Sequence, residues 1–105
     1  MTVLSIKKDD FKKEVLEYKG TVLVDFYADW CGPCKIMGPI VDKLSDQLKN
    51  IRFTKVNVDE NPDLSTEYSI FSIPTLLIFK EGKMISQMVG VVSRDQLLNT
   101  LMTLP

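Results

Sequence analysis

Histidine is absent from this 105-residue chain, and cysteine occurs only twice. A tetrahedral zinc site takes four ligands, most often cysteine and histidine, so these two cysteines form half of such a site. Carboxylates such as Asp25 and Asp29 would be poor replacements for the missing ligands. We therefore expect no bound metal.

A strong charge of either sign is absent as well, because 13 basic and 14 acidic residues leave a formal net charge of −1. Nucleic acids and anionic membranes attract basic surfaces, so neither is an expected partner.

No apolar run approaches the roughly 20 residues that cross a bilayer, and residues 1–7 lack the pattern of a signal peptide. A cytoplasmic location is the expectation. In that reducing compartment two cysteines are more often catalytic or metal-binding than structural, with an inert surface disulfide as the alternative.

A chain with 45% apolar and 26% charged residues is typical of a globular protein, and we expect one domain over residues 1–105. Apolar spacing predicts strands at 3–6, 21–28, 51–58, 75–79 and 84–89. It predicts a helix capped by Asp9 and Asp10 and ending at Gly20, a helix from Pro33 to about Leu48 kinked at Pro39, a short helix starting at Asn61-Pro62, and a helix capped by Ser93. The order βαβαβαββα indicates an α/β fold ending in an antiparallel hairpin, with Gly82 at positive φ in its turn.

Both cysteines lie in the segment Trp30-Cys31-Gly32-Pro33-Cys34-Lys35, between a predicted strand and a predicted helix. Two thiols one helical turn apart can close into a disulfide. Backbone N–H groups at the helix start favour a thiolate, so we expect Cys31 to lie at or before the first turn, partly exposed, with a pKa below about 8.5. Cys31 is then the nucleophile, and Cys34, deeper on the same helical face, is the resolving thiol. Pro33 fits the first helical position, and Gly32 leaves room for a partner chain.

Asp25 interrupts the apolar run 22–26, in a strand that we expect to be covered on both faces. A buried, unpaired carboxyl has a raised pKa and can exchange protons near neutrality. The alternative is that Asp25 points to solvent at a strand edge.

The chain resembles the thioredoxin family over essentially its whole length. The residues that carry the resemblance are the segment from Asp25 to Lys35, Pro39, Asp59-Glu60-Asn61-Pro62, Ile73-Pro74-Thr75, Gly82 and Gly90. The resemblance implies a central five-stranded mixed sheet flanked by four helices, with a cis peptide bond before Pro74. It also implies that Asp25 lies behind Cys34 and takes its proton, and that Lys55 on the next strand tunes Asp25.

The same resemblance assigns residues to target recognition. Trp30, the only tryptophan, would be an exposed shield beside the thiols; its alternative is a core anchor. Pro74 would lie against the dithiol, and the backbone before it would pair with an extended target. A shallow apolar groove is expected from Trp30, Val58, Ile73, Val89, Gly90 and Val91.

The function implied by the resemblance is reduction of protein disulfides by a monomer that cycles between the Cys31/Cys34 dithiol and disulfide. No bound cofactor is expected, because electrons would come from a thioredoxin reductase, an NADPH-dependent flavoprotein. An oxidase or isomerase module is one alternative, against which the Gly32-Pro33 dipeptide argues. A non-catalytic subunit of a larger complex is another.

The chain departs from the common family pattern at a few positions. Ser69 and Ser72 stand where many members have glycine, and Phe71 lies between them. Packing of Phe71 against the neighbouring helix is one interpretation, and its role is open. Gly38 replaces a usual alanine, at some cost to the helix.

Overall fold

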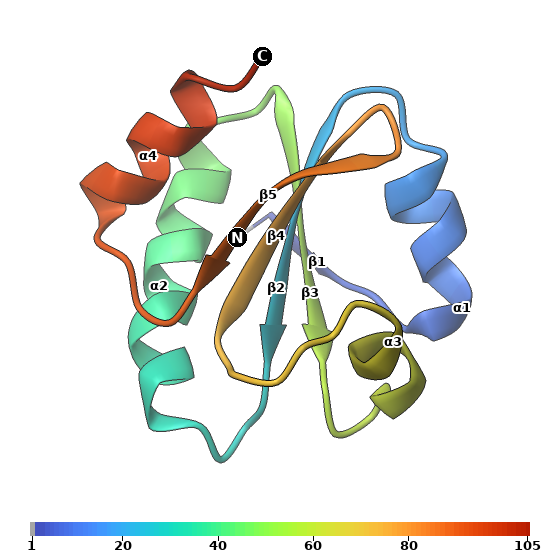
Figure 1. The fold of residues 1–105 in the computed structure, drawn as a ribbon. Helices are drawn as coiled ribbons and strands as arrows, with labels where there is room; N and C mark the ends of the chain where they lie inside the picture. Colours follow the sequence, from blue (N-terminus) through green and yellow to red (C-terminus); the bar gives the residue numbers. More distant parts are fainter. Residues whose placement is uncertain (1) are drawn as a thin grey trace.

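The computed structural model describes residues 2–105, and its elements follow the predicted order (Figure 1). Within those residues the strands are β1 (Val3–Ser5), β2 (Thr21–Tyr27), β3 (Ile51–Asn57), β4 (Thr75–Lys80) and β5 (Lys83–Val89). The helices are α1 (Lys8–Phe11), continued by the π-helix η1 (Lys12–Leu16), then α2 (Gly32–Gln47), α3 (Pro62–Glu67) and α4 (Arg94–Met102).

The strands form one mixed sheet in the order β1-β3-β2-β4-β5. β3 pairs in parallel with β1 and β2, whereas β4 is antiparallel to both β2 and β5. The predicted five-stranded mixed sheet is therefore confirmed, and β2, the strand that leads to Cys31, lies at its centre.

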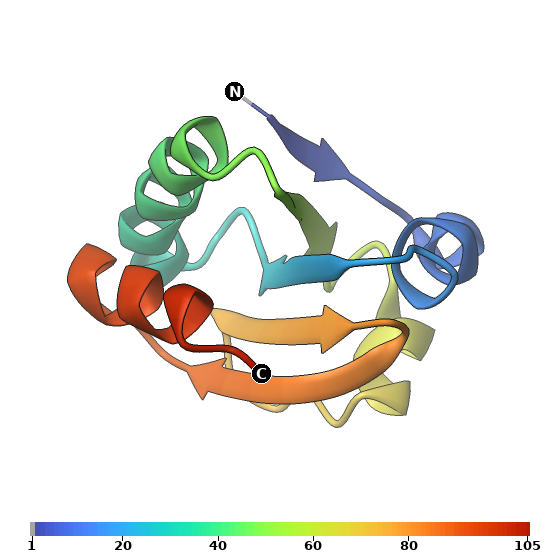
Figure 2. The same cartoon turned by 90° about the horizontal axis from the view of Figure 1, so that it is seen from above.

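Helices cover both faces of the sheet: α2 and α4 lie on one face, and α1 and α3 lie on the other (Figures 1 and 2). Side chains along a strand alternate between the faces. On β2, Val22 and Val24 belong to the core under α1 and α3, and Leu23 belongs to the core under α2 and α4. By this alternation Asp25 lies on the α2 side, together with Leu23.

The first helix differs from the prediction at both ends. The N-cap residue is Lys7 rather than Asp9 or Asp10, and both acids lie in the first turn. From the third helical position, the Asp10 carboxylate caps the helix start by accepting a hydrogen bond from the Lys7 backbone N–H at 3.1 Å. The helix ends at Leu16 rather than Gly20. The N–H of the C-cap residue Glu17 donates to the carbonyl of Lys12 and closes the last turn.

The β4–β5 hairpin has two turn residues at positive φ, Glu81 (51°) and Gly82 (79°). The prediction for Gly82 is confirmed, whereas the positive φ of Glu81 was not predicted. A β-carbon at Gly82 would lie 2.5 Å from the backbone oxygen of Leu16. The hairpin tip is therefore packed closely against the end of the first helix.

Candidate functional site

Cys31 is the N-cap residue of α2 and is disulfide-bonded to Cys34, with 5.3 Å between their Cα atoms. The backbone N–H of Cys34 donates to the Cys31 Sγ atom at 3.2 Å. The helix begins at Gly32, so Pro33 is its second residue rather than its first. At either position no helical hydrogen bond is lost, because a backbone N–H in the first turn has no acceptor within the helix. A free N–H group at a helix start stabilises a sulfur that carries negative charge, and here one points at Cys31.

The expected difference in depth between the two thiols is wrong for this disulfide form. Cys31 is 3% exposed and Cys34 is 7% exposed, so Cys31 is neither partly exposed nor the shallower residue. Both pack with Ala28, Val58 and Ile73 in a small cluster, which covers Cys31. The carbonyl oxygen of Ile73 lies 3.8 Å from the Cys31 Sγ atom.

Asp25 is 5% exposed and lies on the central strand β2, which excludes the alternative of a solvent-facing residue at a strand edge. Its Oδ1 atom is buried without a hydrogen-bond partner. Burial raises the pKa of Asp25 from 3.8 to about 7; the positive charge of Lys55 opposes this rise, and the negative charge of Asp42 adds to it. Asp25 therefore changes its charge near neutral pH, as the sequence predicted.

Asp25 and Cys34 line the same cavity, of about 250 Å³. Lys55 from β3 and Asp42 from α2 also line it. Asp25 and Lys55 are paired residues of the parallel strands β2 and β3. The cavity gives a polar space in which a water molecule could connect the carboxyl of Asp25 with the sulfur of Cys34.

Trp30 is 70% exposed, so it is not a core anchor. Its indole Nε1–H donates to the carboxylate of Asp59 at 2.8 Å. Asp59 is itself held by its backbone N–H, which donates to the side chain of Asn57 at 2.9 Å. The loop after β3 thus fixes the orientation of the ring beside Cys31.

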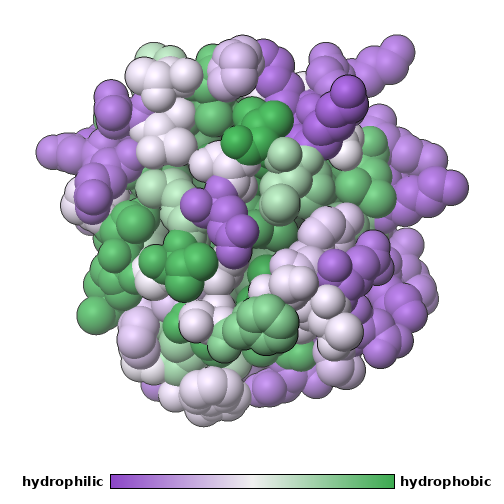
Figure 3. All heavy atoms as spheres, in the orientation of Figure 1, coloured by the Kyte–Doolittle hydropathy of each residue, from purple (hydrophilic) through white to green (hydrophobic). Residues whose placement is uncertain are grey.

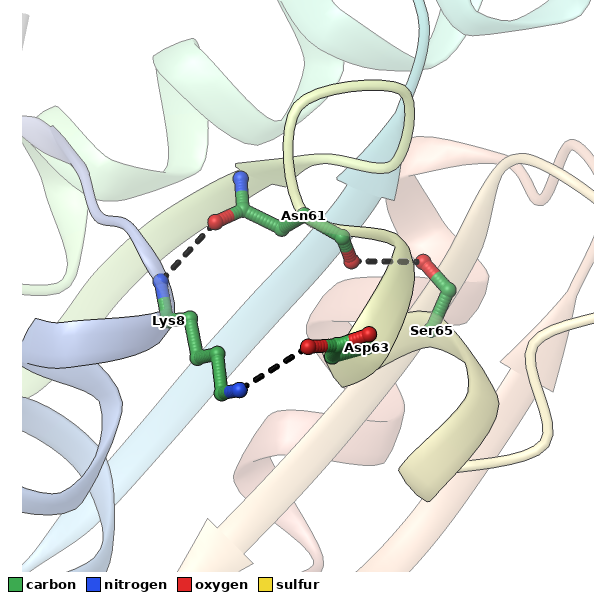
Figure 4. A network of polar contacts seen from close by, with 4 residues as sticks. All are labelled: Lys8, Asn61, Asp63 and Ser65. Atoms are coloured by element: carbon green, nitrogen blue, oxygen red, sulfur yellow. Dashed lines mark hydrogen bonds and ion pairs between the residues drawn. The ribbon is translucent and has the colours of Figure 1, made fainter.

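That loop is connected to the first helix by the polar network in Figure 4. The Asn61 side chain accepts from the backbone N–H of Lys8 at 2.9 Å, and its amide donates to the carbonyl of Asn57 at 3.0 Å. The Lys8 ammonium forms an ion pair with Asp63 at 2.9 Å, and the hydroxyl of Ser65 donates to the carbonyl of Asn61. Two buried asparagines therefore tie α1, the loop and α3 together.

The recognition residues of the sequence prediction lie around the disulfide. The Ile73–Pro74 peptide bond is cis, as predicted. The N–H of Gly90 donates to the carbonyl of Pro74 at 2.8 Å, and Val89 pairs with Thr75 across the hairpin. Val89 and Val91 are exposed, whereas Val58 and Ile73 are half-buried. Figure 3 shows hydrophobic side chains over α2, the end of β5 and the loop before β4 in the lower half of one face, with further hydrophobic side chains in the upper half of that face.

Two residues of the site were missed by the sequence reasoning. Asp42 was not singled out, because a carboxylate on an amphipathic helix is ordinarily solvent-exposed. Asp59 was quoted only as part of a motif, and its contact with Trp30 joins residues 29 positions apart. Within residues 2–105, no three histidine, cysteine or acidic side chains come together to hold a metal ion.

A disulfide at a helix start, on a mixed sheet and next to a buried carboxyl, defines a thiol–disulfide oxidoreductase. Comparison with known proteins identifies the family. The family model for thioredoxin matches residues 2–103, and the chain belongs to the thioredoxin family.

Curated relatives match most of the chain. It is 50% identical over 92 residues to thioredoxin 1 of Synechococcus elongatus, covering 87% of this chain and 86% of the relative. It is 46% identical over 96 residues to the thioredoxin of Rickettsia felis (90% and 91%) and 42% identical over 102 residues to that of Pyropia yezoensis (96% and 95%). The protein is thus a protein-disulfide oxidoreductase whose redox-active group is the Cys31–Cys34 disulfide, and its family implies disulfide-containing targets and a reductase partner. In the described part of the chain, no helix is long and apolar enough to span a membrane.

Proposed function

We propose that Cys31 is the nucleophile and Cys34 the resolving thiol in the reduction of target disulfides. The Cys31 thiolate attacks one sulfur of the target, whose S–S bond breaks; the other target sulfur leaves as a thiolate and takes up a proton. Cys34 then loses its proton and attacks the Cys31 sulfur, which releases the second target thiolate for protonation. Two electrons and two protons pass to the target, and the Cys31–Cys34 disulfide forms.

The observation that carries this assignment is the hydrogen bond from the Cys34 N–H to the Cys31 Sγ atom. The donor is directed at Cys31 and belongs to the first turn of α2, so it supports negative charge on that sulfur. Gly32 and Pro33, both exposed, place no large side chain next to Cys31, although Val58 and Ile73 cover it in the disulfide form.

Asp25 is the proposed proton acceptor for Cys34 in the second step. The shared cavity and the raised pKa support this role, because a group that titrates near 7 can accept a proton and return it. Lys55 is a positioning residue, since its charge favours the ionised form of Asp25.

The target polypeptide would lie over Trp30, Val58, Ile73, Val89, Gly90 and Val91. Pro74 would keep its ring against the disulfide and leave the backbone of Ile73 for pairing with an extended target segment. An apolar surface with backbone pairing reads few side chains, so broad target choice follows.

The partner that returns the electrons is proposed to be an NADPH-dependent flavoprotein reductase, with the protein acting as a monomeric electron carrier in the cytoplasm. The family membership supports this proposal.

Trapping tests the order of the two thiols. Cys34→Ser should accumulate mixed disulfides with target proteins through Cys31, detected by mass spectrometry after acid quenching, and Cys31→Ser is the matched control that should trap none. Trapping by Cys31→Ser alone would reverse the assignment, and trapping by neither would favour a non-catalytic subunit. Equilibration of the wild type with glutathione separates a reductase from an isomerase: a potential near the isomerase value of about −180 mV would contradict the proposal.

A further inference from the structure

Phe71 is the most exposed large hydrophobic residue among those that the structure describes, at 91%. The interpretation that it packs against the neighbouring helix is therefore wrong. An aromatic side chain left in water gains free energy when a partner covers it. The ring of Phe71 is thus available for an apolar contact with a partner molecule.

The backbone on both sides of Phe71 is anchored. The N–H of Ile70 donates to the carbonyl of Ser65 at 2.8 Å, and the Ile70 side chain packs against the core under α1 and α3. On the other side, the carbonyl of Ser72 accepts from the hydroxyl of Thr75 at 2.6 Å. A side chain on an anchored backbone loses less conformational entropy on binding than one on a mobile loop.

Phe71 also lies close to the disulfide. It is two residues from Ile73, whose carbonyl oxygen is 3.8 Å from the Cys31 Sγ atom, and two residues span at most about 7 Å of chain. The established activity brings the sulfur of a target to Cys31, and the proposed pairing of the target with the backbone of Ile73 places the polypeptide next to that sulfur over this surface. A target running alongside 71–73 advances about 3.3 Å per residue, which places Phe71 opposite a residue about two positions from the attacked cysteine.

We propose that Phe71 is a specificity-determining residue that contacts an aromatic or aliphatic side chain of the target, about two residues from the attacked cysteine. This inference rests on the function proposed above. Removal of apolar surface from water at that contact favours such targets over targets with a small polar residue there.

The test uses peptides of Ser and Gly with one cysteine joined by a disulfide to thionitrobenzoate. One peptide has Phe two residues before the cysteine, one has Phe two residues after it, and one has neither. The Cys31 thiolate of the reduced protein attacks the peptide sulfur and expels the coloured thionitrobenzoate; Cys34 then expels the peptide thiolate. The rate with the symmetrical thionitrobenzoate disulfide, which carries no peptide, normalises each variant.

Wild-type protein should react roughly tenfold faster with one of the two Phe peptides than with the plain peptide. Phe71→Ser should lose that preference, and Phe71→Leu should keep part of it. Met102→Ser is the matched control and should keep the wild-type preference, because Met102 is 68% exposed and is the last residue of α4, which lies on the other side of the molecule from α3 and the loop that follows it (Figure 1).

A wild type without preference, or a Phe71→Ser variant that retains it, would overturn the proposal. If Phe71→Ser kept the peptide preference but was no longer reduced by the flavoprotein reductase, the proposal would be overturned, and Phe71 would be a contact for the reductase. Self-association of the wild type but not of Phe71→Ser, in sedimentation equilibrium, would overturn it in favour of a second copy. A wild type that reduces no probe at all would refute the underlying function, which is a distinct result.

Discussion

Asp25 and Lys55 are paired across the two central parallel strands, and both line the cavity that reaches Cys34. The pair is unequal, because Asp25 is buried and its Oδ1 atom has no hydrogen-bond partner, whereas Lys55 is half-buried. The charge of Asp25 therefore affects both the folding free energy and the chemistry of the site.

Asp25→Asn should stabilise the protein at alkaline pH. The pKa of Asp25 rises from 3.8 to about 7 on folding, so the ionised carboxyl costs about 4 kcal/mol of stability at high pH. This cost is absent below pH 4, grows as pH rises from about 4 to 7, and is constant above 7. Burying an amide without partners costs about 1–3 kcal/mol, which leaves a net gain of about 2 kcal/mol at pH 8.

Urea unfolding at a series of pH values from 4 to 9 measures this difference. The free energy of unfolding of the wild type should fall from pH 4 to pH 7 relative to that of the variant. Parallel curves would show that Asp25 does not titrate as the structure indicates.

The same substitution should slow the release of mixed disulfides by Cys34. In the wild type, the rate of release should increase as pH rises through about 7, where Asp25 becomes able to accept a proton. Asp25→Asn should lose at least tenfold near pH 7, as expected for removing a general base. Rapid-quench measurement of a preformed mixed disulfide tests this, and equal rates across neutral pH would remove the role of Asp25.

Lys55→Gln and Asp42→Asn should move the pH profile of that release in opposite directions. The charge of Lys55 lowers the pKa of Asp25 and that of Asp42 raises it. The midpoint should therefore shift to higher pH in Lys55→Gln and to lower pH in Asp42→Asn. A merely structural role would change the rate without moving the midpoint, and shifts of the same sign would contradict the arrangement.

Asp59→Ala should free the Trp30 ring without unfolding the protein. Because the hydrogen bond between them lies at an exposed position, its loss should cost less than about 1 kcal/mol. The indole N–H proton should exchange faster with water in NMR spectra, and kcat/KM for protein disulfides should fall by a few fold. Asp63→Ala removes an exposed carboxylate that binds Lys8 instead, so it should leave the indole signal unchanged.

Two glycine-to-alanine substitutions should change stability with opposite signs. Gly82→Ala would place a β-carbon 2.5 Å from the Leu16 oxygen at a φ of +79° and should destabilise by about 2–4 kcal/mol. Gly38→Ala meets no atom within 4 Å inside α2 and should stabilise by about 1 kcal/mol. Thermal unfolding of both variants measures these changes. Stability changes of the same sign in the two variants would contradict the prediction.

The order of strands and helices along the chain and the cysteine pair could be predicted because they depend on local patterns. The apolar run around Asp25 indicates a central strand whatever lies next to it, and the capping residues Ser93 and Gln96 give the start of α4, which the structure confirms. The N-cap residue of the first helix was mispredicted because Asp10 caps from the third helical position, where it accepts from the Lys7 N–H, and does not itself occupy the N-cap position. Local sequence does not distinguish these two uses of an acidic residue.

The parts of the site that could not be predicted depend on contacts between distant segments. The exposure of Phe71 follows from the direction of its loop, which Ile70 and Ser72 fix through contacts with other elements. The depth of Cys31 follows from the cover that Val58 and Ile73 provide. Neither contact leaves a periodic signal in the sequence.

The position of Trp30 also has a practical consequence. Because Trp30 is the only tryptophan and precedes Cys31 directly, all indole emission from this protein originates beside its reactive bond. Opening and closing of that bond can therefore be followed optically, in real time and without a label, in any of the variants described above that retain the ring.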